Sequence, residues 1–262
     1  MMAARLRKWL ERRTRERAER QWTRLSQRVE RLGPASLRRL RDEALGLRAS
    51  INRFLQGTDR RALQSRAMLD TLPLPAGTDW RWRPGFMAAP VAQRGIARPQ
   101  PGSRLDDYAT IWHDCPERAL LLEQFSSPGA TDLSPFGLRL EVFGFSGSFL
   151  SLAIDLPPEA LAGLTRRHVL RLEITIAVER PLGIYGRMNI GHGPNVEEIA
   201  QKFAEIEAGP QHRQVVEFDL AYTEMNDRRL DKIWLDLIFE HPRMSAVEIH
   251  ELFLSRHLRA EF

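Results

Sequence analysis

Apolar residues in the first part of the chain recur every three or four positions, which is the spacing of a helix turn. One series runs over residues 22–32 and ends at Gly33-Pro34, and a second runs over residues 37–54. Because glycine and proline interrupt helices, the pattern predicts two helices joined at this pair. Each apolar stripe needs a partner to be buried, so the pattern favours either an antiparallel helical hairpin or a coiled coil with another subunit.

From about residue 119 apolar and polar positions alternate, which is typical of strands with one wet face. The clearest cases are residues 150–156 and 170–178. Further predicted strands cover residues 119–125, 138–145, 184–190, 215–220, 233–240 and 247–255. Helical potential in this part is confined to residues 159–164 and 196–206. The predicted fold class is α+β, with a basic N-terminal α-helical segment followed by an antiparallel, jelly-roll-like β-sandwich.

Residues 73–104 separate the two patterns and contain six prolines and four glycines. This density of helix and strand breakers predicts a linker in which neither helix nor sheet persists. Trp80 and Trp82 are costly to leave in water, so we expect them to dock on the folded body. The predicted domains are a helical hairpin or coiled-coil region over residues 1–72, a linker over 73–104 and a β-sandwich over 105–262.

Charge divides the chain at nearly the same place. The first 66 residues hold 19 Lys and Arg against 7 Asp and Glu, a net charge of +12, whereas the whole chain carries +5, so the remainder carries −7. A polybasic segment is attracted to polyanions, and this one predicts contact with an anionic membrane surface or with nucleic acid, which the sequence does not separate. The arginines expected to make this contact are Arg12, Arg13, Arg15, Arg17, Arg20 and Arg24.

The chain contains one cysteine, Cys115, which excludes an internal disulfide framework and fits a reducing compartment. Charged residues interrupt the N-terminal segment before the apolar run of a signal peptide can form. The sequence also lacks the stretch of about 18 apolar residues that a membrane-spanning helix needs. These features predict a cytoplasmic protein, with association at a membrane surface as the alternative.

Three segments of the C-terminal part are distinctive, namely residues 149–157 (FLSLAIDLP), 191–198 (GHGPNVEE) and 216–222 (VEFDLAY). Together they resemble a family of uncharacterised alphaproteobacterial proteins of unknown function, and the likeness covers roughly residues 105–262. This resemblance implies no activity. More loosely, residues 233–242 (IWLDLIFEHP) and 247–256 (VEIHELFLSR) are similar to the last two strands of jelly-roll carbohydrate-binding modules. That likeness is architectural and implies binding rather than catalysis, with a glycan as candidate ligand.

The segment Gly191 to Asn195 follows a predicted strand and has two interpretations. As a ligand-binding loop, it would present His192 and Asn195 as donors together with Arg187. As a tight turn, it would place Asn195 as the cap of a helix that begins at Val196. The turn is the favoured interpretation.

Glycan binding also predicts aromatic side chains on the wet face of the sandwich, where they stack on sugar rings. Tyr185, Tyr222 and Trp234 are the candidates. The favoured alternative for Trp234 is structural, with the side chain covered by Trp80 or Trp82.

Catalytic and metal-binding patterns are weak. Glycoside hydrolysis requires two carboxylates across a cleft, and the candidates, all at outward strand positions where charge is expected anyway, are Glu173, Glu217, Asp219 and Asp236. In His113-Asp114-Cys115 neighbouring side chains of an extended chain point to different faces, so they do not form a nucleophile with its base. His241, His250 and His257 have no second cysteine beside them, so no metal site is predicted.

The sequence therefore favours a non-catalytic binding or assembly protein. In this interpretation the β-sandwich recognises a ligand, with a glycan as candidate, and the N-terminal helices self-associate or meet a partner. We predict no cofactor, no metal and no catalytic residue. The alternatives are peripheral membrane or nucleic-acid binding through the arginine-rich arm, and a glycan-active enzyme.

Overall fold

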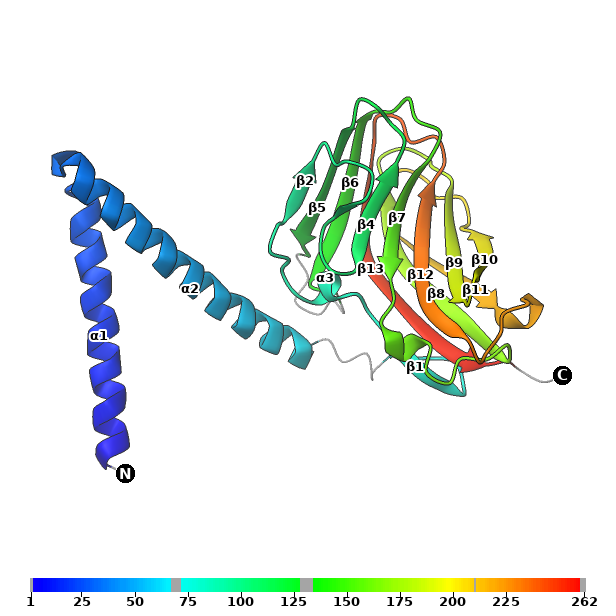
Figure 1. Cartoon of the computed structure of the whole chain (residues 1–262), viewed down its shortest axis with the longest axis horizontal. Coiled ribbons are helices and arrows are strands. Elements are labelled where there is room, and N and C mark those ends of the chain that lie inside the picture. The colour runs from blue at the N-terminus through cyan, green and yellow to red at the C-terminus, as the bar shows by residue number, and fades with distance from the viewer. Residues whose placement is uncertain (1, 67–71, 128–133, 210, 260–262) are drawn as a thin grey trace. The chain divides into compact units, whose positions relative to one another are not determined.

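The computed structural model describes residues 2–66, 72–127, 134–209 and 211–259 (Figure 1). By its contacts the chain divides into two compact units, Met1–Leu55 and Gln56–Phe262. The first unit is helical, and the second contains two antiparallel sheets that pack as a sandwich. The predicted fold class, a helical segment followed by a jelly-roll-like sandwich, is confirmed.

Helix α1 covers Met2–Ser26, a short 3-10 turn η1 covers Val29–Arg31, and helix α2 covers Pro34–Arg66. Pro34 opens α2 because its fixed φ suits the first helical position, where no intrahelical N–H bond is lost. Helix α2 contains the whole apolar series 37–54 that predicted it, whereas α1 ends at Ser26, so the helix predicted over residues 22–32 is wrong in its bounds and overlaps only the last turn of α1. Most of the apolar stripe of α2 is exposed, with Phe54 at 69%.

The larger sheet has seven strands. In order they are β11 (His212–Asp219), β8 (His168–Val178), β13 (Ser245–Leu258), β6 (Phe136–Gly144), β5 (Ala119–Ser126) and β2 (Gly95–Ala97), with β1 (Thr78–Trp82) also pairing with β13. The long strand β13, red in Figure 1, pairs along one edge first with β6 and then with β1. β1 therefore continues the sheet where β6 leaves it.

The second sheet has six strands. In order they are β10 (Asn195–Lys202), β9 (Ile184–His192), β12 (Leu230–Phe239), β7 (Leu150–Asp155), β4 (Ala109–His113) and β3 (Ser103–Arg104). Side chains of alternate residues from both sheets meet between them, and Leu172, Ile174, Leu235 and Leu237 are at most 1% exposed. This burial removes apolar surface from water and is the main stabilising contribution to the sandwich. Every strand predicted from the alternation is present.

The segment predicted as a linker, 73–104, contains secondary structure, so the expectation that no sheet persists there was wrong. It holds β1, the one-turn helix α3 (Gly85–Ala88), β2 and β3. The prolines lie between these elements rather than inside them, and strands of a few residues fit between the breakers. The docking of Trp80 and Trp82 is confirmed, because both pack against the core.

The helix predicted over residues 196–206 is also wrong, since β10 occupies Asn195–Lys202. Gly193 has a φ of +65° and is followed by Pro194, whose φ is fixed and negative. This combination suits a two-residue hairpin turn that folds β10 back onto β9. Tertiary pairing therefore overrides the helix propensity of this segment, and Asn195 pairs with His192 instead of capping a helix. The other predicted helix, 159–164, is reduced to the 3-10 turn η3 (Pro158–Ala160).

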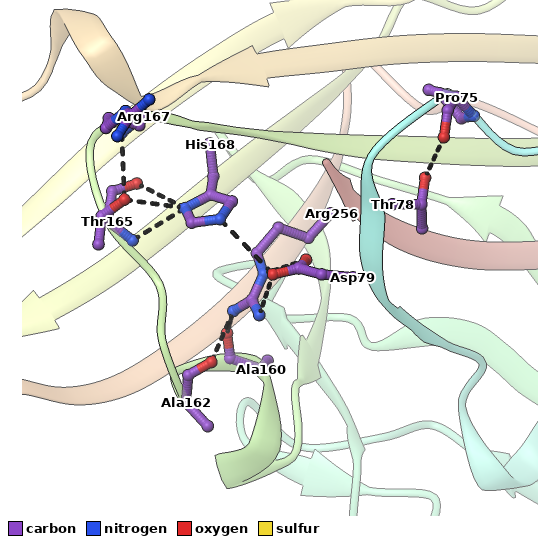
Figure 2. A network of polar contacts seen from close by, with 9 residues as sticks. All are labelled: Pro75, Thr78, Asp79, Ala160, Ala162, Thr165, Arg167, His168 and Arg256. Carbon is purple, nitrogen blue, oxygen red and sulfur yellow. Dashed lines mark hydrogen bonds and ion pairs between the residues drawn. The ribbon is translucent and has the colours of Figure 1, made fainter. Parts of the chain in front are cut away.

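A polar network fastens β1 to the sandwich (Figure 2). Arg256 of β13 is only 5% exposed, and its Nε and Nη2 donate to the two oxygens of Asp79 at 2.8 and 2.9 Å. Its Nη1 donates to the carbonyl oxygens of Ala160 and Ala162 at 3.1 and 3.0 Å. His168 Nε2 lies 3.6 Å from Asp79 Oδ2. One guanidinium therefore joins β1, β13 and the turn after β7.

This network predicts a pH dependence of stability. Burial alone would raise the pKa of Asp79. The hydrogen bonds and charge of Arg256 lower this pKa by more than burial raises it, so it lies below its ordinary value. A depressed folded-state pKa gives stability that is complete above the unfolded-state pKa, about 3.9, and is lost as pH falls through the folded-state value. We expect wild-type protein to lose its stability advantage over Asp79→Asn in that acidic range, as measured by urea unfolding at a series of pH values. A constant difference between the two proteins would contradict this role.

Candidate functional site

A cleft of about 700 Å³ lies on the outward face of the six-stranded sheet. Thr110, Ser151 and Ala153 form its floor, while Trp112 and Trp234 are the large aromatic side chains that line it. Because side chains of alternate residues share a face, small residues on β4 and β7 leave a hollow between larger ones. The cleft is therefore built by the strand register itself.

One row of paired residues crosses the whole cleft. Arg104 is paired with Thr110, Thr110 with Ala153, Ala153 with Asp236, and Asp236 with Arg187. The row thus begins and ends with an arginine, and its middle members are short. A ligand that lies over this row meets hydrogen-bond donors at both ends.

The two tryptophans lie on different strands and at different positions along the strand direction. Trp112 is opposite Ser151, which in turn is opposite Ile238, whereas Trp234 is opposite Asp155. The path from Trp112 to Trp234 crosses two strand spacings, from β4 over β7 to β12, and runs four residues along β12. These two displacements place the tryptophan backbones about 16 Å apart. Trp112 is 46% exposed. This separation suits an extended ligand rather than a single small ring.

Arg187 is held in place by carboxylates. Its Nη2 and Nε donate to Asp236 Oδ2 at 2.9 and 3.3 Å, and its Nη1 donates to Glu198 at 3.2 Å. Asn189 Nδ2 also donates to Asp236 Oδ2, at 2.9 Å. A guanidinium carries five N–H groups, so an oriented Arg187 retains donors for a ligand.

A second polar group surrounds Asp155. Lys232 Nζ lies 3.1 Å from Asp155 Oδ1, and Arg104 Nη2 lies 3.8 Å from Asp155 Oδ2. Lys232 Nζ also lies 4.8 Å from the ring centroid of Trp234, a cation–π contact. Lys232 therefore covers one face of Trp234, and Trp112 is the more accessible aromatic surface.

Phe149 reaches the cleft from a loop that Asp114 organises. Asp114 accepts hydrogen bonds from Ser148 N at 2.7 Å, Ser148 Oγ at 2.6 Å and Phe149 N at 3.2 Å. The Ser148 hydroxyl is the main reason that the pKa of Asp114 is lowered. A Cβ at Gly147 would overlap Asp114 Oδ1, so only glycine permits this approach. Asp114 thus positions an aromatic side chain.

We expect Asp114→Ala to loosen this loop without unfolding the sandwich. The amides of Ser148 and Phe149 lose their acceptor, so their hydrogen exchange becomes several-fold faster, and ligand affinity in the cleft falls. Asp114→Asn keeps one oxygen acceptor and serves as the matched control, with a smaller effect. Unchanged exchange at Phe149 in the alanine variant would contradict the positioning role.

The structure brings together only part of the predicted ligand-binding set. Arg187 and Trp234 line the cleft. Tyr185 lies on the same sheet face near the start of β9, outside the cleft lining, and Lys202 Nζ is 5.0 Å from its ring centroid. The structural interpretation of Trp234 was wrong, because it faces the cleft, whereas Trp80 and Trp82 belong to β1 in the other sheet. Tyr222, another aromatic candidate, lies outside the cleft and is 81% exposed.

The predicted donors His192 and Asn195 lie away from the cleft lining. His192 is buried at 6% exposure, accepts a hydrogen bond from Asn226 N at 3.3 Å and lies 3.4 Å from Glu197. Asn195 is exposed beside the hairpin turn. Positions 187 and 192 have opposite parity along β9, so Arg187 and His192 point to opposite faces.

The candidate catalytic carboxylates do not gather at one site. Glu173 and Glu217 lie on the seven-stranded sheet and both pair with Arg171, at 3.0 and 2.7 Å. Asp219 accepts a hydrogen bond from Ala221 N and pairs with Arg259. Asp236 is in the cleft, where Arg187 engages it.

His113 and Cys115 have structural partners. His113 Nε2 lies 3.1 Å from the carbonyl oxygen of Pro99, and His113 Nδ1 accepts from Cys115 N at 3.2 Å. Cys115 Sγ donates to Glu117 at 3.2 Å. Across the part of the chain that the structure describes, no group of three His, Cys, Asp or Glu residues has the geometry to hold a metal ion.

All six arginines predicted to bind a polyanion lie on α1. Arg13, Arg17, Arg20 and Arg24 are exposed, whereas the side chains of Arg12 and Arg15 lie outside the described set. Arg20 Nη2 is 3.9 Å from Glu16. Within the described ranges, no helix is long and apolar enough to cross a bilayer.

Several cleft residues were missed in the sequence, namely Trp112, Phe149, Arg104, Asp155 and Lys232. The alternation over Ala109–His113 was a usable signal, because Ala109, Ile111 and His113 are buried while Trp112 is exposed. No local signal marks Phe149, which depends on the loop held by Asp114.

Solved structures with a similar fold include two carbohydrate-binding modules and the enzymatically active domain of a bacteriophage tailspike protein. The C-terminal family 22 carbohydrate-binding module of Clostridium thermocellum Xyn10B has 7% identity and a TM-score of 0.42, over 73% of this chain and 99% of that one. The family 11 module from C. thermocellum has 7% identity and a TM-score of 0.38, over 62% and 94%. The tailspike protein 4 domain of bacteriophage CBA120 has 7% identity and a TM-score of 0.42, over 58% of this chain and only 20% of the tailspike chain.

These likenesses concern the fold alone and carry no function to this chain. No curated protein matches it. A family model, in contrast, matches residues 1–262. The expected membership of a family of unknown function is confirmed: the chain belongs to the family of unknown function DUF6478.

Proposed function

We propose that the protein is a non-catalytic recognition protein whose sandwich binds an extended saccharide chain and whose helical region, residues 1–72, self-associates. The observation that supports the saccharide is the cleft on the six-stranded sheet, where exposed Trp112 lies beside oriented charged groups. The ring faces of sugars are apolar and their edges carry hydroxyl groups. An aromatic platform next to fixed donors and acceptors is complementary to both.

The paired charges favour a neutral ligand. Asp236 is 4% exposed and engaged by Arg187, and Asp155 is engaged by Lys232 and Arg104. A hydroxyl group both donates and accepts, so it bonds to either member of such a pair without leaving a charge uncompensated. A strongly anionic ligand would instead compete with Asp155 and Asp236 for the same cations.

The glycan-active enzyme is the less favoured alternative. Glycoside hydrolysis needs two carboxylates that act on opposite sides of one bond. Asp155 and Asp236 lie on neighbouring strands β7 and β12, and each is committed to cations. Their geometry suits orientation of donors better than attack on a substrate. Binding of an anionic membrane or nucleic acid by α1 remains a separate proposal based on charge.

The experiment is a titration of the full chain with neutral oligosaccharides, followed by tryptophan fluorescence and by calorimetry. Xylohexaose, a β-1,3-1,4-mixed-linked tetrasaccharide and β-1,4-galactotriose are suitable probes. We expect saturable binding of at least one longer chain, with a change in tryptophan emission and no shortening of the probe. Shortening of the chain would favour the enzyme, and absence of binding to every probe at millimolar concentration would contradict the proposal.

A further inference from the structure

We propose that α2 forms a parallel, in-register, two-stranded coiled coil with the α2 of a second copy through residues 37–54. This inference deepens the proposed self-association and rests on it. The seam consists of Leu37, Leu40, Ala44, Leu47, Ile51 and Phe54. Their spacing alternates three and four throughout, which is the 3.5-residue repeat of a coiled coil.

Four of the six seam residues are exposed, and Leu40 and Ala44 are half-buried. Leu37, Leu47, Ile51 and Phe54 are 40%, 42%, 48% and 69% exposed. A row of large apolar side chains in water is unfavourable, and the row is one narrow stripe rather than the wide face of a helix that packs on a globular core. A second copy presents an identical stripe and buries both at once.

Charge beside the seam favours a parallel pair. In heptad terms Leu37, Ala44 and Ile51 are a positions, so Glu43 is a g position and Arg48 is the e position of the next heptad. In a parallel pair, the residue at each g position faces the residue at the e position of the following heptad on the partner helix. Glu43 of each copy therefore faces Arg48 of the other, which gives two such pairs in the dimer. Glu43 is 3.9 Å from Arg39 in its own helix, and this exposed contact is weak enough to coexist with the second.

The antiparallel arrangement is disfavoured by the same residues. There, e positions face e positions, and Arg41 and Arg48 both occupy e. Arginine would then face arginine without an acid between them. Ile51 at a with Leu40 and Leu47 at d also fits the preference of parallel two-stranded coils for a β-branched a position and leucine at d.

Cross-linking distinguishes the two orientations in the full chain. In a Cys115→Ser background, Leu40→Cys and Ile51→Cys are made separately and treated with a short thiol cross-linker. In the parallel coil each variant cross-links to its own copy. In the antiparallel coil position 40 lies opposite position 51, so a mixture of the two variants cross-links while each alone does not. The second pattern would overturn the parallel arrangement but leave self-association intact.

A matched pair of variants tests the seam. Leu45 and Leu47 are each 42% exposed, but Leu45 lies off the seam. We expect Leu47→Glu to make the protein monomeric in light scattering across a concentration series, while Leu45→Glu leaves the dimer unchanged. If the two variants changed the dimer equally, or if Leu47→Glu abolished binding to anionic vesicles and left the dimer intact, the proposed seam would be wrong.

Charge reversal tests the Glu43–Arg48 contact. We expect Arg48→Glu to weaken dimerisation by about tenfold, because two attractive pairs become repulsive. Adding Glu43→Arg restores opposite charges and should recover most of the affinity. Failure of this rescue would contradict the parallel contact. A wild-type chain that stays monomeric at high concentration would overturn both this inference and the proposed self-association, without bearing on the saccharide cleft.

Discussion

Replacement of Trp112 by alanine is expected to weaken saccharide binding by roughly thirtyfold, equivalent to about 2 kcal/mol. Trp112 is the most exposed tryptophan of the cleft, and its indole lies against the backbone turn at Gly102. The turn supports the ring, so little side-chain freedom is lost when a sugar stacks on it. The loss should appear in calorimetry as a higher Kd with unchanged stoichiometry.

The controls separate stacking from general exposure. Phe143 is 59% exposed on β6 in the other sheet, so Phe143→Ala should leave affinity unchanged. Trp112→Phe retains an aromatic ring and should lose less affinity than the alanine variant. Trp234→Ala should have a smaller effect than Trp112→Ala because Lys232 covers one face of Trp234. Full affinity in Trp112→Ala would show that the ligand does not use the cleft.

Replacement of Arg256 by alanine is expected to lower the free energy of unfolding by about 3 kcal/mol. The side chain is 6% exposed and makes four hydrogen bonds, two to Asp79 and two to the carbonyls of Ala160 and Ala162 (Figure 2). Without it these carbonyls lose charge-assisted donors, and β1 loses its side-chain link to β13. Urea unfolding followed by circular dichroism measures the change.

The matched control is Arg259→Ala. Arg259 pairs with Asp219 at 3.1 Å but is 47% exposed, so its removal should cost less than about 1 kcal/mol. Asp79→Ala should cost at least as much as Arg256→Ala, because it leaves the guanidinium of Arg256, which is 6% exposed, without its counter-charge, whereas Asp79, at 44% exposure, is solvated when Arg256 is removed. Similar costs for Arg256→Ala and Arg259→Ala would indicate that burial of the network contributes little.

Some of the cleft could be predicted from the sequence and some could not. Trp234 was a candidate because it lies one position out of phase with buried Ile233 and Leu235, and the cleft lining confirms its outward direction. His192 was a candidate because it sits near a loop, but its position in β9 directs it into the interior. The alternation of residues along a strand therefore predicted side-chain exposure better than nearness to a loop did.

Local propensity failed where tertiary pairing decided the conformation. Residues 196–202 contain Glu, Ala and Gln, which favour a helix, yet the turn at Gly193-Pro194 returns them to β9 as an edge strand. Its charged residues then protect the sheet edge from further pairing. In the segment 73–104, the prolines correctly indicated where secondary structure is interrupted. The strands between them were missed because each is only two to five residues long.

The division of the chain into a basic helical part and an antiparallel sandwich can be predicted from the residues alone, because helices and strands bury side chains at different periods. The period of two also decided which face each strand residue occupies. Which strands are neighbours became known from the folded chain, and with it the fact that Trp112, Ser151, Asp236 and Arg187, which are far apart in the sequence, line one cleft. The physical reason is that periodicity depends on residues close in sequence, whereas strand order depends on pairing and packing between distant segments.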